Sequence, residues 1–289
     1  MSDAPINTSA VITGDRKLVF TSESGTLYGF DIFTNAIQTV PKWKISFGDI
    51  VTKAPAIDAT NNIYIGTNTG RLIKLKLNEA GTVSVLWNVT LPSPIQSSPV
   101  IDADGFVYVG QNSGDFSKIN PTNGELIWTF NTSSTINSAP FINEYGTIYI
   151  ANESGYVYAI DANKNIKWMY KDEDGIVANI LYVKGMLYFG SLSGAYTAIF
   201  DDPNSVAINT NLTTTVSAGK VNQSIKTLNT TAVPVREPIW GTFQGNYKRN
   251  GAKPLDCPPK PTIRSLNNGL FSFCESSSLP IRYSDTTIN

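Results

Sequence analysis

The chain has 289 residues, of which 41% are hydrophobic and 16% are charged, and its 22 basic and 23 acidic residues give a formal net charge of −1. This composition is typical of a globular protein with one large domain and a short appendage. No cluster of lysine or arginine supplies the phosphate contacts that nucleic acid binding needs, and no apolar run reaches the roughly 18 residues of a membrane-spanning helix. We therefore expect no nucleic acid partner and no membrane span.

The chain contains no histidine. This absence excludes Ser-His-Asp and Cys-His catalysis and most kinds of zinc site. Chemistry based on carboxylate, tyrosine or lysine side chains remains open.

A repeat of about 40 residues runs along most of the chain. Ser-Gly or Thr-Gly dipeptides recur with their glycines 45, 44, 41 and 39 residues apart, at positions 25, 70, 114, 155 and 194. Tryptophans keep nearly the same step, 44, 41 and 40 residues, at positions 43, 87, 128 and 168. A period of this length with several short strands per unit is the signature of a β-propeller.

Each repeat reads as four strands in chain order. The first is a short Pro-x-Ile-Asp segment such as residues 55–58, and the second alternates hydrophobic residues, as in 62–66. The Ser-Gly turn leads into the third, such as 155–160, and the fourth ends on the tryptophan, as in 125–128. Period-two alternation and turns every 8 to 12 residues predict an all-β chain with four-stranded blades.

The tryptophans have a structural role in this interpretation. Each large ring fills the gap between neighbouring blades, where it buries on the order of 200 Å². The same role is assigned to the later tryptophan that precedes the tail, so the structural set is Trp43, Trp87, Trp128, Trp168 and Trp240.

The repeats predict the domain boundaries. A propeller covers residues 1–252, with repeats at about 9–51, 52–95, 96–136 and 137–176 and an irregular unit at 177–252. This last unit lacks the tryptophan expected near position 208 and continues as polar strands or a long loop to Trp240. Five repeats predict either a small ring or an incomplete one.

Particular motifs resemble a known repeat. The segments 98–102, 105–110 and 119–128 are similar to the pyrroloquinoline-quinone-like propeller repeat, which also occurs in the outer-membrane protein assembly lipoprotein. Residues 240–251 resemble a segment that borders such propellers in secreted bacterial proteins. Residues 253–289 resemble the start of an immunoglobulin-like module, as in Bacteroidetes-type surface proteins, and form a truncated stub or tail because a complete module needs about 100 residues.

The resemblance raises the possibility of a quinone-dependent dehydrogenase. In those enzymes a calcium ion, an aspartate base and a disulfide between adjacent cysteines hold the cofactor on the propeller axis. The repeats here contain no cysteine. We therefore expect no catalytic residue, no metal and no cofactor. The two cysteines of the chain, Cys257 and Cys274, bracket the tail and either form a disulfide or remain separate thiols.

Tyrosines outside the phase of the repeat are the candidate ligand contacts, at a blade face or rim: Tyr145, Tyr156, Tyr170, Tyr182 and Tyr196. Those at the regular second-strand position are predicted to lie in the core: Tyr64, Tyr108, Tyr149 and Tyr188. The acidic runs 102–105 and 172–175 lack the spacing of a calcium loop and are read as turn residues.

These features together predict a non-catalytic binding propeller of a secreted or cell-surface bacterial protein, with a protein or a glycan as its partner in adhesion or a related role. An alternative is an envelope assembly scaffold similar to the outer-membrane assembly lipoprotein. That alternative predicts a lipid-modified amino-terminal cysteine, which this sequence lacks. The dehydrogenase is the third hypothesis. The surface location implies a signal peptide that is removed or encoded upstream.

Overall fold

The computed structural model describes residues 2–32, 39–183, 185–201, 263–264 and 270–271. Every regular element in these ranges is a β-strand, which confirms the all-β prediction. The chain divides into two compact units, Met1–Pro254 and Leu255–Asn289.

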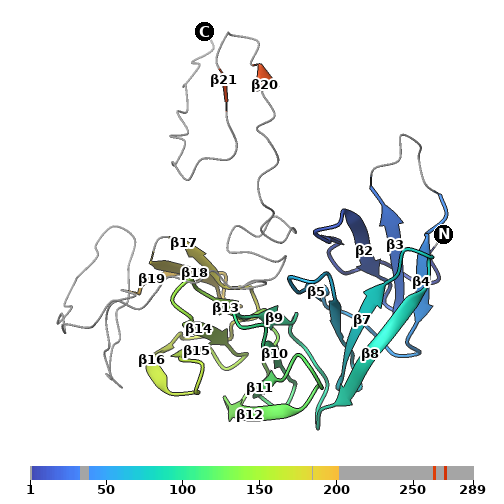
Figure 1. Ribbon diagram of the computed structural model, residues 1–289. Helices are drawn as coiled ribbons and strands as arrows, with labels where there is room; N and C mark the ends of the chain where they lie inside the picture. Colours follow the sequence, from blue (N-terminus) through green and yellow to red (C-terminus); the bar gives the residue numbers. More distant parts are fainter. Residues whose placement is uncertain (1, 33–38, 184, 202–262, 265–269, 272–289) are drawn as a thin grey trace. The chain divides into compact units, whose positions relative to one another are not determined.

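The first unit carries five antiparallel sheets that follow one another along the chain, coloured from blue to olive in Figure 1. The first is β1 (Val11–Ile12), β2 (Lys17–Thr21), β3 (Thr26–Asp31) and β4 (Trp43–Ser46). The second is β5 (Ala56–Ile57), β6 (Ile63–Gly66), β7 (Arg71–Leu77) and β8 (Val83–Thr90). The third is β9 (Val100–Ile101), β10 (Val107–Gly110), β11 (Asp115–Ile119) and β12 (Leu126–Asn131).

The fourth sheet is β13 (Phe141–Ile142), β14 (Ile148–Ala151), β15 (Tyr156–Ile160) and β16 (Ile166–Lys171). The described part of the fifth is β17 (Leu181–Val183), β18 (Met186–Gly190) and β19 (Tyr196–Phe200). In every sheet the strands pair in chain order, as expected for the blades of a propeller. Residues 202–252, including Trp240, lie outside the described residues.

The described part of the second unit is one hairpin of β20 (Ile263–Arg264) and β21 (Leu270–Phe271). Cys257, Cys274 and most of the segment that resembles an immunoglobulin-like module lie outside the described residues. The disulfide therefore stays a prediction.

The fourth strands differ from the sequence-based expectation in one respect. They do not end on the tryptophan: β12 continues past Trp128 to Asn131, and β4 begins at Trp43. The residues after the tryptophan pair with the start of the third strand, as Asn131 does with Asp115. The tryptophan thus lies inside the strand or at its start rather than at its end.

The second strands form the centre of the core. Ile63, Tyr64 and Ile65 of β6 are all fully buried, so both faces of this strand are covered. The simple alternation of inside and outside residues predicted from the sequence therefore does not apply to these strands. All three core clusters combine residues of neighbouring blades, which explains why both faces of a blade are apolar.

Two glycines of the third blade show why the repeat keeps this residue. Gly114 has a φ of 87°, and a Cβ there would lie 2.7 Å from the backbone nitrogen of Ser134. A Cβ at Gly110 would lie 2.4 Å from a methyl carbon of Ile136. The turn and the end of β10 thus both pack directly against the connection to the next blade.

Candidate functional site

Neighbouring blades are joined by the repeated tryptophans. Each indole Nε1 donates a hydrogen bond to the segment that follows the third strand of the next blade. The acceptors are Asn78 O for Trp43 (2.6 Å), Pro121 O for Trp87 (3.0 Å), Ala162 O for Trp128 (3.2 Å) and Asp201 Oδ1 for Trp168 (2.8 Å). These four residues hold the propeller together and are not free to serve a ligand.

Two lysines strengthen the same junctions. Lys74 Nζ donates to Pro121 O at 2.8 Å, and Lys118 Nζ donates to Ala162 O at 3.4 Å. Each carbonyl therefore accepts hydrogen bonds from a tryptophan and a lysine of the preceding blade. Burial lowers the pKa of both lysines, since it disfavours the ammonium form.

Each of these lysines has an aspartate nearby. Asp58 lies 3.8 Å from Lys74 and accepts a hydrogen bond from the Tyr64 hydroxyl at 3.0 Å. In the third blade, Tyr108 donates to Asp102 at 2.8 Å. Burial and the adjacent carboxylate together raise the pKa of both tyrosines. The same carboxylates bind backbone N–H groups of their own turns, which agrees with the turn role predicted for Asp102.

The fourth blade has neither the aspartate nor the lysine of this arrangement. Asn143 occupies the position of the aspartate, and Ala159 pairs with Tyr149 where a lysine pairs with tyrosine in the two preceding blades. The Tyr149 hydroxyl accepts a hydrogen bond from Asn143 at 2.9 Å and donates one to Asp201. Lysine and aspartate are thus present together or absent together in these three blades.

A cavity of about 210 Å³ lies where all five blades begin. Its lining residues come from the segments just before the first strand of each blade: Asn7, Thr8, Ser9, Thr52, Lys53, Ala54, Ser98, Asn137, Ala139, Val177 and Asn179. Hydroxyl and amide groups dominate this set, and Lys53 is its single charged residue. The cavity is therefore polar and carries one positive charge.

Lys53 reaches across the cavity from the second blade to the fourth. Its Nζ donates to the carbonyl oxygen of Asn137 at 3.2 Å and to the side-chain oxygen of the same residue. Asn137 in turn donates from its amide nitrogen to Glu153 at 3.2 Å. Burial lowers the pKa of Lys53, although the charge of Glu153 opposes this shift.

Lys53 was not predicted from the sequence, yet the repeat holds a signal for it. Lys53 lies three residues before the first strand of its blade, β5. The same position in the third and fourth blades is held by Ser97 and Ser138. Both serines are fully buried. A lysine in a position otherwise filled by a small buried residue marks a departure from the structural repeat.

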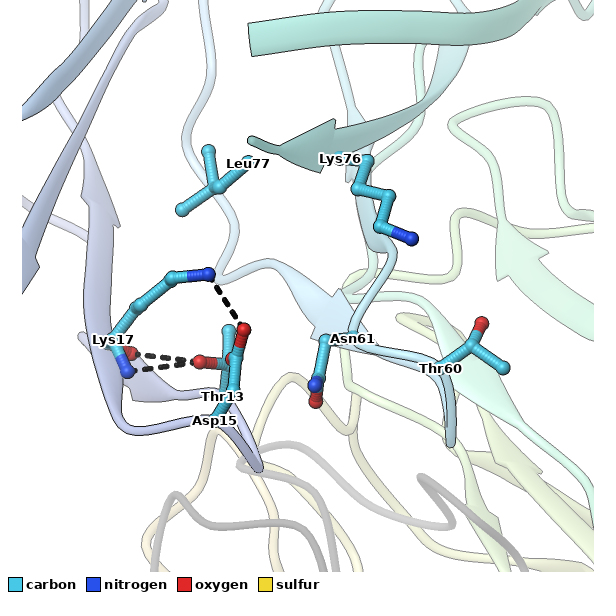
Figure 2. A pocket seen from close by; sticks show the side chains of 7 residues that line it. All are labelled: Thr13, Asp15, Lys17, Thr60, Asn61, Lys76 and Leu77. Atoms are coloured by element: carbon cyan, nitrogen blue, oxygen red, sulfur yellow. Dashed lines mark hydrogen bonds and ion pairs between the residues drawn. The ribbon is translucent and has the colours of Figure 1, made fainter. Parts of the chain in front are cut away.

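A second cavity, of about 160 Å³, lies between the first two blades and is shown in Figure 2. Lys17 Nζ lies 2.6 Å from Asp15 and 2.8 Å from Glu79, so its charge is paired within the protein. Burial alone would lower the pKa of Lys17, but the two carboxylates outweigh that effect and raise it. Lys76 is exposed and extends from β7 beside Asn61. This cavity is a charge-balanced junction between blades.

The five candidate tyrosines do not come together in one site. Tyr196 is 69% exposed and stacks on Tyr188, with ring centroids 6.1 Å apart. Tyr145 lies half-buried in a turn, and Tyr156 lies half-buried on β15.

Tyr170 and Tyr182 are only 7% and 2% exposed and belong to the same core cluster. The expectation that they lie at an accessible rim is therefore corrected, because both faces of a blade are covered by its neighbours. Of the in-phase tyrosines, Tyr64, Tyr108 and Tyr149 are fully buried, as predicted for the core. The core prediction is wrong for Tyr188, which is only half-buried and stacks on the exposed Tyr196.

The outer strands expose aliphatic side chains at repeated positions. These residues precede the tryptophan by one or two positions and are about half exposed: Val85 and Leu86 on β8, Leu126 and Ile127 on β12, and Ile166 on β16. Each strand is the last of its sheet, so its outer edge has no partner strand within the described residues. Edges and aliphatic side chains together form an outer rim.

No group of three or more acidic, histidine or cysteine side chains that could hold a metal ion occurs within the described ranges. No helix in that part of the chain is long and apolar enough to span a membrane.

The chain is similar in sequence and in fold to known proteins. The model of the family described as outer membrane protein assembly factor BamB matches residues 76–215. No curated protein matches the chain. Solved structures with a similar fold include BamB from Moraxella catarrhalis, at 16% identity and a TM-score of 0.58, covering 68% of this chain and 62% of that one.

Two other similar folds are the computationally designed protein Ika8 and BBS1N in its complex with ARL6DN. Ika8 has 14% identity and a TM-score of 0.59 over 69% of this chain and 59% of its own. BBS1N has 16% identity and a TM-score of 0.54 over 70% of this chain and 67% of its own. This chain thus spans about three fifths of BamB and of Ika8. The sequence match and the shared fold confirm the predicted resemblance: the chain carries a β-propeller whose repeats are similar to those of the BamB family.

Proposed function

We propose that the protein is a non-catalytic scaffold of the bacterial envelope that holds a partner protein on the outer rim of its propeller. The similarity of residues 76–215 to an outer membrane protein assembly factor supports an assembly role in the envelope. The exposed aliphatic side chains of the rim favour a protein over a glycan as the partner.

The repeated exposure of aliphatic side chains on β8, β12 and β16 is the observation that carries this proposal. The loop that leads into β12 packs on the preceding blade, since a Cβ at Gly124 would lie 3.0 Å from the ring of Trp87. Leu126 and Ile127 follow directly and are 46% and 45% exposed. Apolar side chains beside an unpaired strand edge suit an extended polypeptide that adds to the sheet.

The residues at the centre of the five blades do not fit the quinone cofactor of the related dehydrogenases. That cofactor is held with a calcium ion, and calcium prefers carboxylate and carbonyl oxygen ligands. The cavity described above is lined by no carboxylate and contains the ammonium group of Lys53. A fixed positive charge opposes a divalent cation at this place, which supports a non-catalytic role.

Site-specific photo-crosslinking in the producing bacterium tests the proposal. A photoreactive residue at Ile127 or Ile166 is expected to give an adduct with one discrete envelope protein. The same residue at Asn112, an exposed position between β10 and β11, should give none. The changes Leu126→Ser and Ile127→Ser should weaken capture by a probe at Ile166 without unfolding the blade. Equal labelling from Asn112, or adducts with no defined protein, would reject the rim as the binding surface.

A cofactor titration tests the non-catalytic part. Incubation with pyrroloquinoline quinone and calcium should leave no stoichiometric cofactor on the protein after gel filtration. Stoichiometric binding accompanied by alcohol oxidation would overturn this part of the proposal.

A further inference from the structure

The cavity of about 210 Å³ where the five blades begin, called the central cavity from here on, contains one charged group without a balancing charge among its lining residues. Lys53 is that group, and the other lining residues are neutral. By contrast, Lys17 in the cavity between the first two blades has two carboxylates within 2.8 Å. These two cavities therefore differ in their electrostatic state.

The hydrogen bonds of Lys53 leave capacity for a ligand. A lysine ammonium has three N–H donors. The two hydrogen bonds described for Lys53 both go to Asn137, one to its main-chain oxygen and one to its side-chain oxygen. Asn137 is itself held in this orientation, because its amide nitrogen donates to Glu153. One face of the ammonium group is thus fixed by the protein, and its third donor is available.

A hydroxyl group in the same lining lacks an internal partner. Ser98 is 3% exposed and lines the cavity, and its hydroxyl makes no hydrogen bond within the described residues. A serine hydroxyl can donate one hydrogen bond and accept others, so the Ser98 hydroxyl can bond to a ligand that enters the cavity. It is therefore a second polar group that gains from a ligand in the cavity.

The charge of Lys53 favours an anion over a neutral ligand. Its nearest counter-charge, Glu153, is exposed and is separated from the ammonium by the amide of Asn137. A partly buried ammonium without direct compensation gains most from an anionic hydrogen-bond acceptor. The cavity of about 210 Å³ is large enough for a small group of this kind.

We propose that the central cavity binds one carboxylate group, with Lys53 as the charged donor and Ser98 as a neutral donor. The carboxylate belongs either to a small free acid or to an acidic side chain of a bound protein. The second source rests on the proposed scaffold function, whereas the first does not.

Calorimetric and NMR titration of the full chain tests this inference. The probes are acetate, its neutral counterpart acetamide, a short peptide with a central glutamate, and the same peptide with glutamine. Acetate or the glutamate peptide should bind and shift the amide resonances of Ala54 and Ala139, while the two neutral probes should not. Acetate binding alone assigns a free acid as the source, and binding of the glutamate peptide alone assigns an acidic side chain.

Three variants separate the site from general charge effects. Lys53→Gln should weaken carboxylate binding by at least about tenfold, since hydrogen bonds to charged groups contribute roughly 1.5–3 kcal/mol and each 1.4 kcal/mol is a factor of ten. Asn137→Asp should also weaken carboxylate binding, because the new aspartate carboxylate would form an ion pair with the Lys53 ammonium group. Lys76→Gln removes the same charge from the other cavity and should leave the affinity unchanged.

Three results would overturn the inference: binding of neither carboxylate probe, equal binding of acetamide and acetate, or wild-type affinity in a folded Lys53→Gln protein. None of these results affects crosslinking at Ile127 on the outer rim. Conversely, loss of the rim adducts would leave the acetate titration unchanged. The two proposals can therefore fail independently.

Discussion

The carbonyl oxygen of Pro121 accepts a hydrogen bond from the indole nitrogen of Trp87 at 3.0 Å, and Lys74 of the same preceding blade donates to it at 2.8 Å. This single acceptor couples the outer strand and the third strand of one blade to the next blade. The tryptophan repeat therefore marks a hydrogen-bonded junction as well as an apolar contact.

The junction allows the hydrogen bond and the ring packing to be separated. Trp87→Phe removes the donor and keeps an aromatic ring, so we expect a loss of about 1 kcal/mol in the free energy of unfolding. Trp87→Ala also removes the contact with Tyr64, whose ring centroid lies 5.8 Å away, and should cost about 3 kcal/mol. Urea denaturation followed by circular dichroism measures both. Equal losses in the two variants would show that ring packing contributes nothing.

The lysine and aspartate of the third blade are expected to depend on each other. Lys118→Ala leaves Asp102 without its nearby cation and should cost about 1–2 kcal/mol. The double variant with Asp102→Asn recreates the asparagine and alanine of the fourth blade and should recover part of this loss. A double-mutant cycle should give a coupling energy of about 1 kcal/mol. Simple additivity of the two changes would contradict the pairing.

Asp58 and Asp102 should influence acid stability in opposite directions. Burial disfavours the Asp58 carboxylate, but hydrogen bonds from Asn62 and Thr60 outweigh burial and lower its pKa. Its stabilisation is thus present above the ordinary pKa of about 3.9 and is lost as the pH falls further. Asp58→Asn should flatten the decline in stability between pH 5 and pH 3.

Burial raises the pKa of Asp102, so this group opposes folding as the pH rises through the raised value. Asp102→Asn should therefore steepen the decline in stability on acidification rather than flatten it. Urea midpoints at several pH values, compared with those of the unchanged protein, measure both effects. A change of the same sign in the two variants would refute this assignment.

Gly114 should tolerate alanine less well than Gly146 does. Both have positive φ, 87° and 76°, so both variants lose roughly 1 kcal/mol from backbone strain. A Cβ at Gly114 would also lie 2.7 Å from the backbone of Ser134, whereas one at Gly146 would meet no atom within 4 Å. Thermal unfolding should show the larger loss for Gly114→Ala. An equal loss would mean that the loop after β12 moves aside without cost.

Tyr182→Phe should leave stability unchanged or increase it slightly. The Tyr182 hydroxyl is buried and has no hydrogen-bond partner within the described residues. Removing an unsatisfied buried hydroxyl relieves its desolvation cost. Tyr149→Phe is the matched control and should destabilise, because that hydroxyl bonds to both Asn143 and Asp201. A clear loss in Tyr182→Phe would show that this hydroxyl has a partner in solution.

The blade pattern could be predicted from the sequence because its causes are local. Gly114 and its equivalents are required by a positive φ, and the strand residues around Tyr64 and Tyr108 repeat with the blade. Such constraints recur in every copy and therefore appear as a period.

The site could not be predicted in the same way, since it depends on contacts between blades. Lys53 and Asn137 are 84 residues apart and meet only because the blades begin around one cavity. The burial of Tyr170 and Tyr182 was missed for a related reason. A residue outside the repeat phase is still covered when another blade packs on its side of the sheet.

The direction of the tryptophan hydrogen bonds has a consequence for synthesis on the ribosome. Each donor precedes its acceptor in the chain, by 35, 34, 34 and 33 residues from the first junction to the fourth. A newly made blade therefore cannot dock until nearly a whole further repeat has been translated, which takes roughly 2–7 s at 5–20 residues per second. Docking then proceeds from the amino terminus onward, one junction per repeat, and each nascent blade waits undocked for its successor.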